Sequence, residues 1–155
     1  MASAAKTIDF SINILKYMAS GQDLPQITQL HIALLSAIPA DKGAGNAPYS
    51  GVEIAACEVS AGDYRVALGQ NKLVSISEDP NTSSMQIISD GGSIDWPDAP
   101  ANFNVSGYAL CSDANSIAGS AYLAYELFDG TNKGRSIIAG DSIKINAGGL
   151  VIKEK

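Results

Sequence analysis

Residues 137–152 restrict the possible folds of this chain more than any other segment. Ile143 and Ile145 alternate with polar residues there, and such a period of two is typical of a strand with one apolar face. Gly140 and Gly148 mark positions where the chain has to turn, because glycine readily adopts a positive φ. The segment therefore predicts short strands that are joined by tight turns and close in a C-terminal hairpin. It offers no arrangement of reactive side chains, which is typical of a structural scaffold.

The chain has 155 residues, a length that predicts one domain with a core of its own. We expect a helix and connecting arm at residues 1–25 and a single β-sandwich domain at residues 26–155. The formal net charge is -6, and the 10 basic residues are scattered, so binding to nucleic acid or to an anionic membrane through a basic patch is not expected. Charged residues make up 17%, below the usual value of about 25%, which favours lasting protein contacts over electrostatic steering.

An amphipathic helix is predicted near the N-terminus. Thr7 is a suitable N-cap, Asp9 suits the positive end of the helix dipole, and Gly21 is a suitable C-cap. Apolar residues cover most of the helix circumference and leave one narrow polar stripe. A helix of this kind must pack on the domain or be covered by a neighbouring subunit. The residues that we expect at such an interface are Ile12, Leu15, Tyr17 and Met18.

The apolar period changes to two after Pro25, which predicts strands for the rest of the chain. The segment from Leu30 to Leu35 is apolar on both faces, so it is expected to be a central strand. Further strands are predicted at 52–59, 64–68, 72–76, 85–88, 93–96, 105–111, 121–127 and 135–139. Residues 40–50 are rich in Gly, Ala, Pro and Asn and predict a long mobile loop. Many short strands separated by turns favour an antiparallel β-sandwich or jelly roll.

The apolar side chains of these strands are expected to form the core. Trp96 is the largest of them and would bury on the order of 200 Å². The expected core residues are Leu30, Ile32, Leu34, Trp96, Tyr108, Ile143, Ile145, Leu150 and Ile152.

Targeting and redox signals are few in this sequence. The first residues lack the apolar run of a secretory signal, and no stretch approaches the roughly 20 apolar residues of a membrane span. Cys57 and Cys111 both lie in strand-like runs, which favours two buried thiols, although a structural disulfide stays open.

Motifs that carry catalysis or bind cofactors are not found. His31 is the sole histidine, which removes most His-based triads and multi-His metal sites. Acidic pairs such as Asp95 and Asp98 show no sign of convergence, and most acidic residues of this kind lie beside Gly, Pro or Asn, where an aspartate commonly caps its own turn. Neither a Gly-x-Ser-x-Gly elbow nor a phosphate-binding loop occurs. We therefore expect no enzymatic activity, no cofactor and no metal site.

Three blocks in a fixed order suggest a particular family. The first is the helix at 12–21, followed by an apolar strand that ends at Pro39. The second is Glu58-Val-Ser-Ala-Gly-Asp-Tyr-Arg-Val66. The third runs from 92–97 through 105–113 to the C-terminal turns. Together these blocks resemble a family of small virion proteins of tailed bacteriophages, often labelled as tail-fibre or minor structural proteins.

The resemblance implies a β-sandwich without catalytic residues that is incorporated into a phage particle. We expect a capsid decoration, or cement, protein that stabilises the head of the virion after assembly in the host cytoplasm. Its expected partners are the phage major capsid protein or tail proteins and further copies of itself, most simply a trimer on a local three-fold axis.

Two alternatives stay open at this point. The chain could be a component of the tail, baseplate or fibre. It could instead be a carbohydrate-binding β-sandwich that contacts the host surface. In that case Trp96, Tyr108, Tyr122 and Tyr125 would line a groove and stack on sugars.

Overall fold

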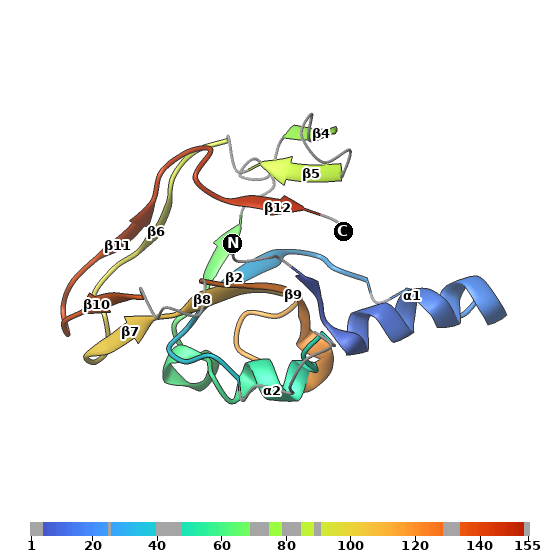
Figure 1. Cartoon of the computed structure of the whole chain (residues 1–155), viewed down its shortest axis with the longest axis horizontal. Coiled ribbons are helices and arrows are strands. Elements are labelled where there is room, and N and C mark those ends of the chain that lie inside the picture. The colour runs from blue at the N-terminus through green and yellow to red at the C-terminus, as the bar shows by residue number, and fades with distance from the viewer. Residues whose placement is uncertain are drawn as a thin grey trace.

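The computed structural model describes residues 5–24, 26–39, 48–68, 75–78, 85–88, 91–128 and 134–153. Most elements in these ranges are strands, and their pairings are antiparallel. The fold is therefore mainly β with few helices, as the sequence predicted (Figure 1). Most of the loop predicted at 40–50 lies outside the described residues.

A five-stranded sheet forms the centre of the molecule (Figure 1). Its strands, in spatial order, are β1 (Ala5–Lys6), β9 (Tyr122–Leu127), β8 (Gly107–Cys111), β2 (Leu30–Leu35) and β3 (Val66–Leu68). Strand β2 has a neighbour on each side, which confirms the interior position that its two apolar faces predicted.

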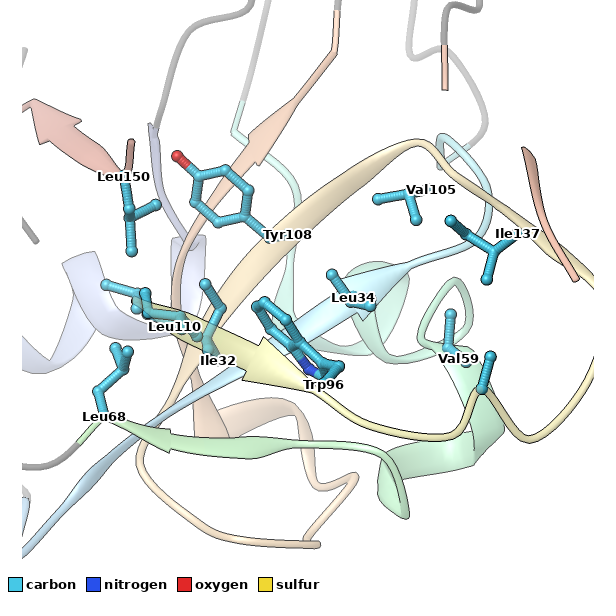
Figure 2. Packing of buried hydrophobic residues seen from close by; sticks show 12 residues of the cluster. Ile32, Leu34, Val59, Leu68, Trp96, Val105, Tyr108, Leu110, Ile137 and Leu150 are labelled. Atoms are coloured by element: carbon cyan, nitrogen blue, oxygen red, sulfur yellow. The ribbon is translucent and has the colours of Figure 1, made fainter. Parts of the chain in front are cut away.

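Both faces of this sheet carry buried apolar side chains. On β2, Ile32 and Leu34 point to one face, whereas Ala33 and Leu35 point to the other, because successive side chains of a strand alternate. Figure 2 shows Trp96 between Ile32 and Leu34 on the first face. Short helices cover the second face, where Ala33 and Leu35 share a buried cluster with helical residues.

Most of the expected core residues are buried or packed against buried ones. The buried members are Ile32, Leu34, Trp96, Tyr108 and Leu150. Three others are half-buried and pack against the same cluster, namely Leu30, Ile143 and Ile145. The side chain of Ile152 lies outside the described part of the structure. Cys57 and Cys111 are buried free thiols, as the sequence favoured.

The predicted C-terminal hairpin is wrong. None of the last three strands described pairs with another of them; each pairs with an earlier strand. The pairs are β10 (Arg135–Ile137) with β7 (Phe103–Val105), β11 (Ile143–Ile145) with β6 (Ile94–Trp96), and β12 (Val151–Lys153) with β5 (Met85–Ile88). The strands within 135–153 therefore run antiparallel along those at 86–88, 94–96 and 103–105, and together they form one interrupted ribbon. Strand β4 (Ser75–Glu78) pairs with the other side of β5.

The turn at Gly140 explains why the hairpin prediction failed. Gly140 has a φ of 88°, as expected for a turn glycine, but the ribbon continues past it. Its N–H donates to the carbonyl of Ala99, and the N–H of Ala99 donates to the carbonyl of Asp141, both at 2.8 Å. This pattern is that of a glycine β-bulge, which adds a residue to one strand without reversing the chain.

Helix α1 (Ile8–Ser20) has the caps that the sequence predicted. Thr7 accepts a hydrogen bond from the backbone of Phe10, and Gly21 closes the helix in the left-handed conformation, with a φ of 66°. The described residues also include a 3-10 turn, η2 (Gly119–Ala121), and the turn segment η1 (Val59–Gly62), whose middle residues have left-handed backbone.

A second helix, α2 (Gly51–Ala55), occupies part of the strand predicted at 52–59, so that prediction is wrong. The cause is a capping box. Ser50 accepts from the backbone of Glu53, and the Glu53 carboxylate accepts from the backbone of Ser50. Among the described residues, no helix is both long enough and apolar enough to cross a membrane.

Candidate interaction surface

Thr7 attaches the start of α1 to the edge of the central sheet. Its side chain is fully buried, and its hydroxyl donates to the carbonyl of Tyr122 at 2.6 Å. Its backbone N–H donates to the carbonyl of Leu123 at 2.9 Å. Because the same hydroxyl also accepts from the N–H of Phe10, one residue both caps the helix and fixes it to β9.

The first turn of α1 is also attached to α2. A carboxylate oxygen of Asp9 accepts from the N–H of Gly51 at 2.6 Å. Gly51 tolerates no side chain, because a Cβ there would lie 1.7 Å from the carbonyl oxygen of Gly119. The N–H of Ile8 donates to the carbonyl of Tyr49 at 3.1 Å. The beginning of α1 is thus held from two sides.

The rest of α1 projects from the body of the molecule (Figure 1). None of its residues is buried, and every residue from Leu15 to Leu24 is exposed. The four residues predicted at an interface are all among the exposed large apolar side chains. Their exposed fractions are 42% for Ile12, 63% for Leu15, 50% for Tyr17 and 74% for Met18.

Three of these side chains form one apolar stripe. Ile12, Leu15 and Met18 follow each other at a spacing of three, and at about 100° per residue they span about 120° of the helix. Tyr17 lies about 100° from Met18, on the opposite side of it from Leu15. Exposed apolar side chains therefore occupy more than half of the circumference of the projecting part.

A buried polar network forms the second unusual feature. Arg65 donates from Nε and Nη2 to the two carboxylate oxygens of Glu58, both at 2.7 Å. The Tyr122 hydroxyl donates to the same carboxylate and accepts from Nη2 of Arg65 at 3.0 Å. The guanidinium carbon lies 5.2 Å from the centre of the Tyr122 ring. Arg65 also donates to the carbonyls of Asp113 and Ser116, at 2.8 and 2.7 Å, so it fixes the loop after β8.

Burial and these contacts together raise the pKa values of Arg65, Tyr122 and the neighbouring Cys111. Burial lowers the pKa of Arg65, but the hydrogen bond to Glu58 and its charge outweigh burial and raise it above its ordinary value. Burial and the hydrogen bond to Glu58 raise the pKa of Tyr122. Burial raises the pKa of the nearby Cys111 to about 12. The network is therefore suited to a structural role, because it presents neither a thiolate nor an unpaired base.

Left-handed backbone lies within the segment that the ion pair closes. Ser60 and Ala61 have φ values of 54° and 49°, and the following Gly62 has a φ of 96°. Left-handed backbone is unfavourable by about 1–2 kcal/mol for a residue with a Cβ. The ion pair between Glu58 and Arg65 joins the two ends of this turn and holds it in place.

The aromatic residues considered for carbohydrate binding do not form a surface groove. Trp96 and Tyr122 are fully buried, and Tyr108 and Tyr125 are 7% and 6% exposed. None of these four rings can stack on a sugar at the surface, so this part of the carbohydrate-binding alternative is wrong. His31 lies on β2, and no group of three His, Cys, Asp or Glu side chains that could hold a metal occurs among the described residues.

No protein-family model matches the chain, and no curated protein matches it. The structural features that bear on function are therefore the projecting apolar helix and the scaffold that holds it.

Proposed function

We propose that the chain is a non-enzymatic structural protein of a tailed-bacteriophage virion, and that it is a capsid decoration protein. The observation that carries this proposal is the projecting part of α1. Leu15 and Met18 are 63% and 74% exposed, although a helix that is apolar over most of its circumference is normally buried. A partner surface is needed to cover them, and the order of sequence blocks described above favours a phage particle.

We propose a β-sandwich as the scaffold for this role, with a jelly roll as the alternative arrangement of the same strands. The central sheet would be one layer, and the ribbon formed by 86–105 and 135–153 would be the other. Trp96 supports this arrangement, because it lies on the ribbon and is fully buried against β2. Such a scaffold suits a protein that must hold one helix in a fixed place.

The proposed partner is the major capsid protein of the head. A decoration protein that binds the assembled shell but not its free subunits adds free energy to the shell by mass action. Three copies would meet on a local three-fold axis of the shell. The protein would be located in the virion, which is assembled in the host cytoplasm. Arg65 and Glu58 fit a structural role here, because their charges are paired with each other.

Quantitative mass spectrometry of purified virions tests this proposal. A decoration protein should approach the copy number of the major capsid protein. A far smaller number would overturn the decoration role and assign the chain to the tail, baseplate or fibre. Absence from the particle would overturn the whole proposal.

A further inference from the structure

We infer that the projecting part of α1 binds in an apolar groove on the assembled particle, and that it does not pair with a second copy of this chain in solution. The inference rests on the proposed function, since it specifies the surface that the particle must offer. Two observations carry it, namely the small size of the projecting helix and the angular spread of its exposed apolar side chains.

The size of the helix argues against a free dimer. A helix of 13 residues is about 20 Å long and about 10 Å wide, so the half of its surface that one neighbour can cover is roughly 300 Å². A stable pair of proteins buries about 800 Å² on each partner. Two copies that touched through α1 alone would therefore not stay together at ordinary concentrations. A groove with two walls covers more of the same helix than a second helix that touches it along one side, so it buries more area for each bound copy.

The spread of side chains argues for a groove. Leu15, Met18 and Tyr17 lie on successive sides of the helix over about 160°. A single flat neighbour or one partner helix covers a stripe of about 100°. Since Tyr17 is 50% exposed and lies outside the stripe of Ile12, Leu15 and Met18, two walls are needed to cover all four residues. Insertion of an amphipathic helix into an apolar groove is a common mode of recognition.

The attachment of α1 prepares it for this binding. An isolated helix of this length is marginally stable in water. Here Thr7 caps the helix and fixes it to β9, and Asp9 fixes the first turn to α2. The helix is therefore formed before it meets the groove, so binding does not have to supply the free energy of ordering it.

The test uses the full-length protein and virions that were assembled without it. Binding is measured by co-sedimentation for the unmodified chain, for a double variant with Leu15→Ser and Met18→Ser, and for Tyr17→Ser. The matched control is Ile138→Ser, since Ile138 is 64% exposed and directly follows β10, which lies at the opposite end of the molecule from α1 (Figure 1). Analytical ultracentrifugation of the free protein reports its oligomeric state, and circular dichroism checks that each variant is folded.

We expect the free protein to be a monomer. The double variant should bind about a hundredfold more weakly, because each lost apolar side chain is worth roughly a factor of ten. Tyr17→Ser should lose about tenfold, and Ile138→Ser should bind like the unmodified chain. If the unmodified chain binds but Tyr17→Ser does not weaken it, the groove is wrong. A free oligomer that the double variant dissociates would show that a second copy is the occupant. Failure of the unmodified chain to bind any particle would instead reject the proposed function.

Discussion

Arg65 and Glu58 form a two-point ion pair in the interior of the molecule, with both nitrogen–oxygen distances at 2.7 Å. The two side chains are 0% and 1% exposed. The net stability of such a buried pair is small compared with an apolar pair, but removal of one partner leaves the other charge buried without compensation. The pair also closes the left-handed turn at Ser60 and Ala61. Several properties of the fold should therefore depend on it.

Replacing Arg65 by Met should destabilise the fold by about 3–5 kcal/mol, because Glu58 would keep a buried charge without its partner. Urea unfolding measures the change. The surface pair of Lys144 and Asp95 is the control, since its atoms lie 3.6 Å apart and its side chains are 59% and 54% exposed. Lys144→Ala should change stability by less than about 1 kcal/mol. Equal losses in the two variants would contradict the structural role of the buried pair.

Replacing Ala61 by Gly should stabilise the fold or leave it unchanged. Ala61 has a φ of 49°, and relief of this strain is worth about 1 kcal/mol, which offsets the greater freedom of glycine in the unfolded chain. The matched control is Ala67→Gly on β3, where Ala67 is also exposed but lies in a strand. That variant should lose about 0.5–1 kcal/mol. The difference between the unfolding midpoints of the two variants reports the backbone strain at Ala61. A clear loss of stability in Ala61→Gly would show that this strain is absent.

A charge at Ile145 should unfold the domain. Ile145 pairs with Ile94 across the ribbon and packs against the main apolar cluster. Ile145→Asp would place a carboxylate against this cluster without a partner, at a loss of several kcal/mol. Thermal unfolding followed by circular dichroism tests this, with Lys144→Gln as the neighbouring exposed control. A native melting temperature for Ile145→Asp would show that the ribbon does not pack on the core.

Stability should fall at alkaline pH. Burial raises the pKa of Cys111 from 9.0 to about 12, so the folded state holds a proton that the unfolded state releases first. The contribution of the protonated thiol to the free energy of unfolding is fully present below pH 9. It is lost between pH 9 and about 12, and the free energy of unfolding falls by at most about 1.4 kcal/mol per pH unit for one group. Urea midpoints between pH 8 and pH 11 measure the loss. Cys111→Ala should flatten the profile, although Tyr122, whose pKa burial also raises, contributes above pH 10. An identical profile in Cys111→Ala would exclude the thiol as a cause.

Local signals explain what the sequence could predict. The ends of α1 depend on Thr7 and Gly21, whose effects act within one turn of helix, so they were correctly placed. The interior position of β2 follows from its own apolar residues. For Leu15 and Met18 the sequence leaves two possibilities, packing on the domain or exposure to a neighbouring subunit. A sequence does not show whether a largely apolar helix packs on its own domain.

Non-local pairing explains what the sequence could not predict. The period of two around Ile143 shows which side chains share a face, but not which strand lies opposite. The pattern therefore does not distinguish the observed ribbon from a hairpin. Val52 and Ile54 also fit a period of two, which hid the capping box of α2. The network around Arg65 joins residues that are up to 64 positions apart in the sequence. Both partners of its ion pair lie in the block at 58–66, but the sequence of that block does not show that they pair.

The anchoring of β1 has a consequence for the order of events during synthesis. Ala5 pairs with Tyr125, so the first described strand has to wait for a partner that is made 120 residues later. Contacts of such long range form late, because the intervening chain has to be closed first. Until β9 is in place, Thr7 lacks the carbonyls of Tyr122 and Leu123, so α1 has only its attachment to Tyr49 and Gly51. A copy that displays the helix in its projecting position has therefore already completed its central sheet, and an incompletely folded copy has no means of competing with it for a binding position.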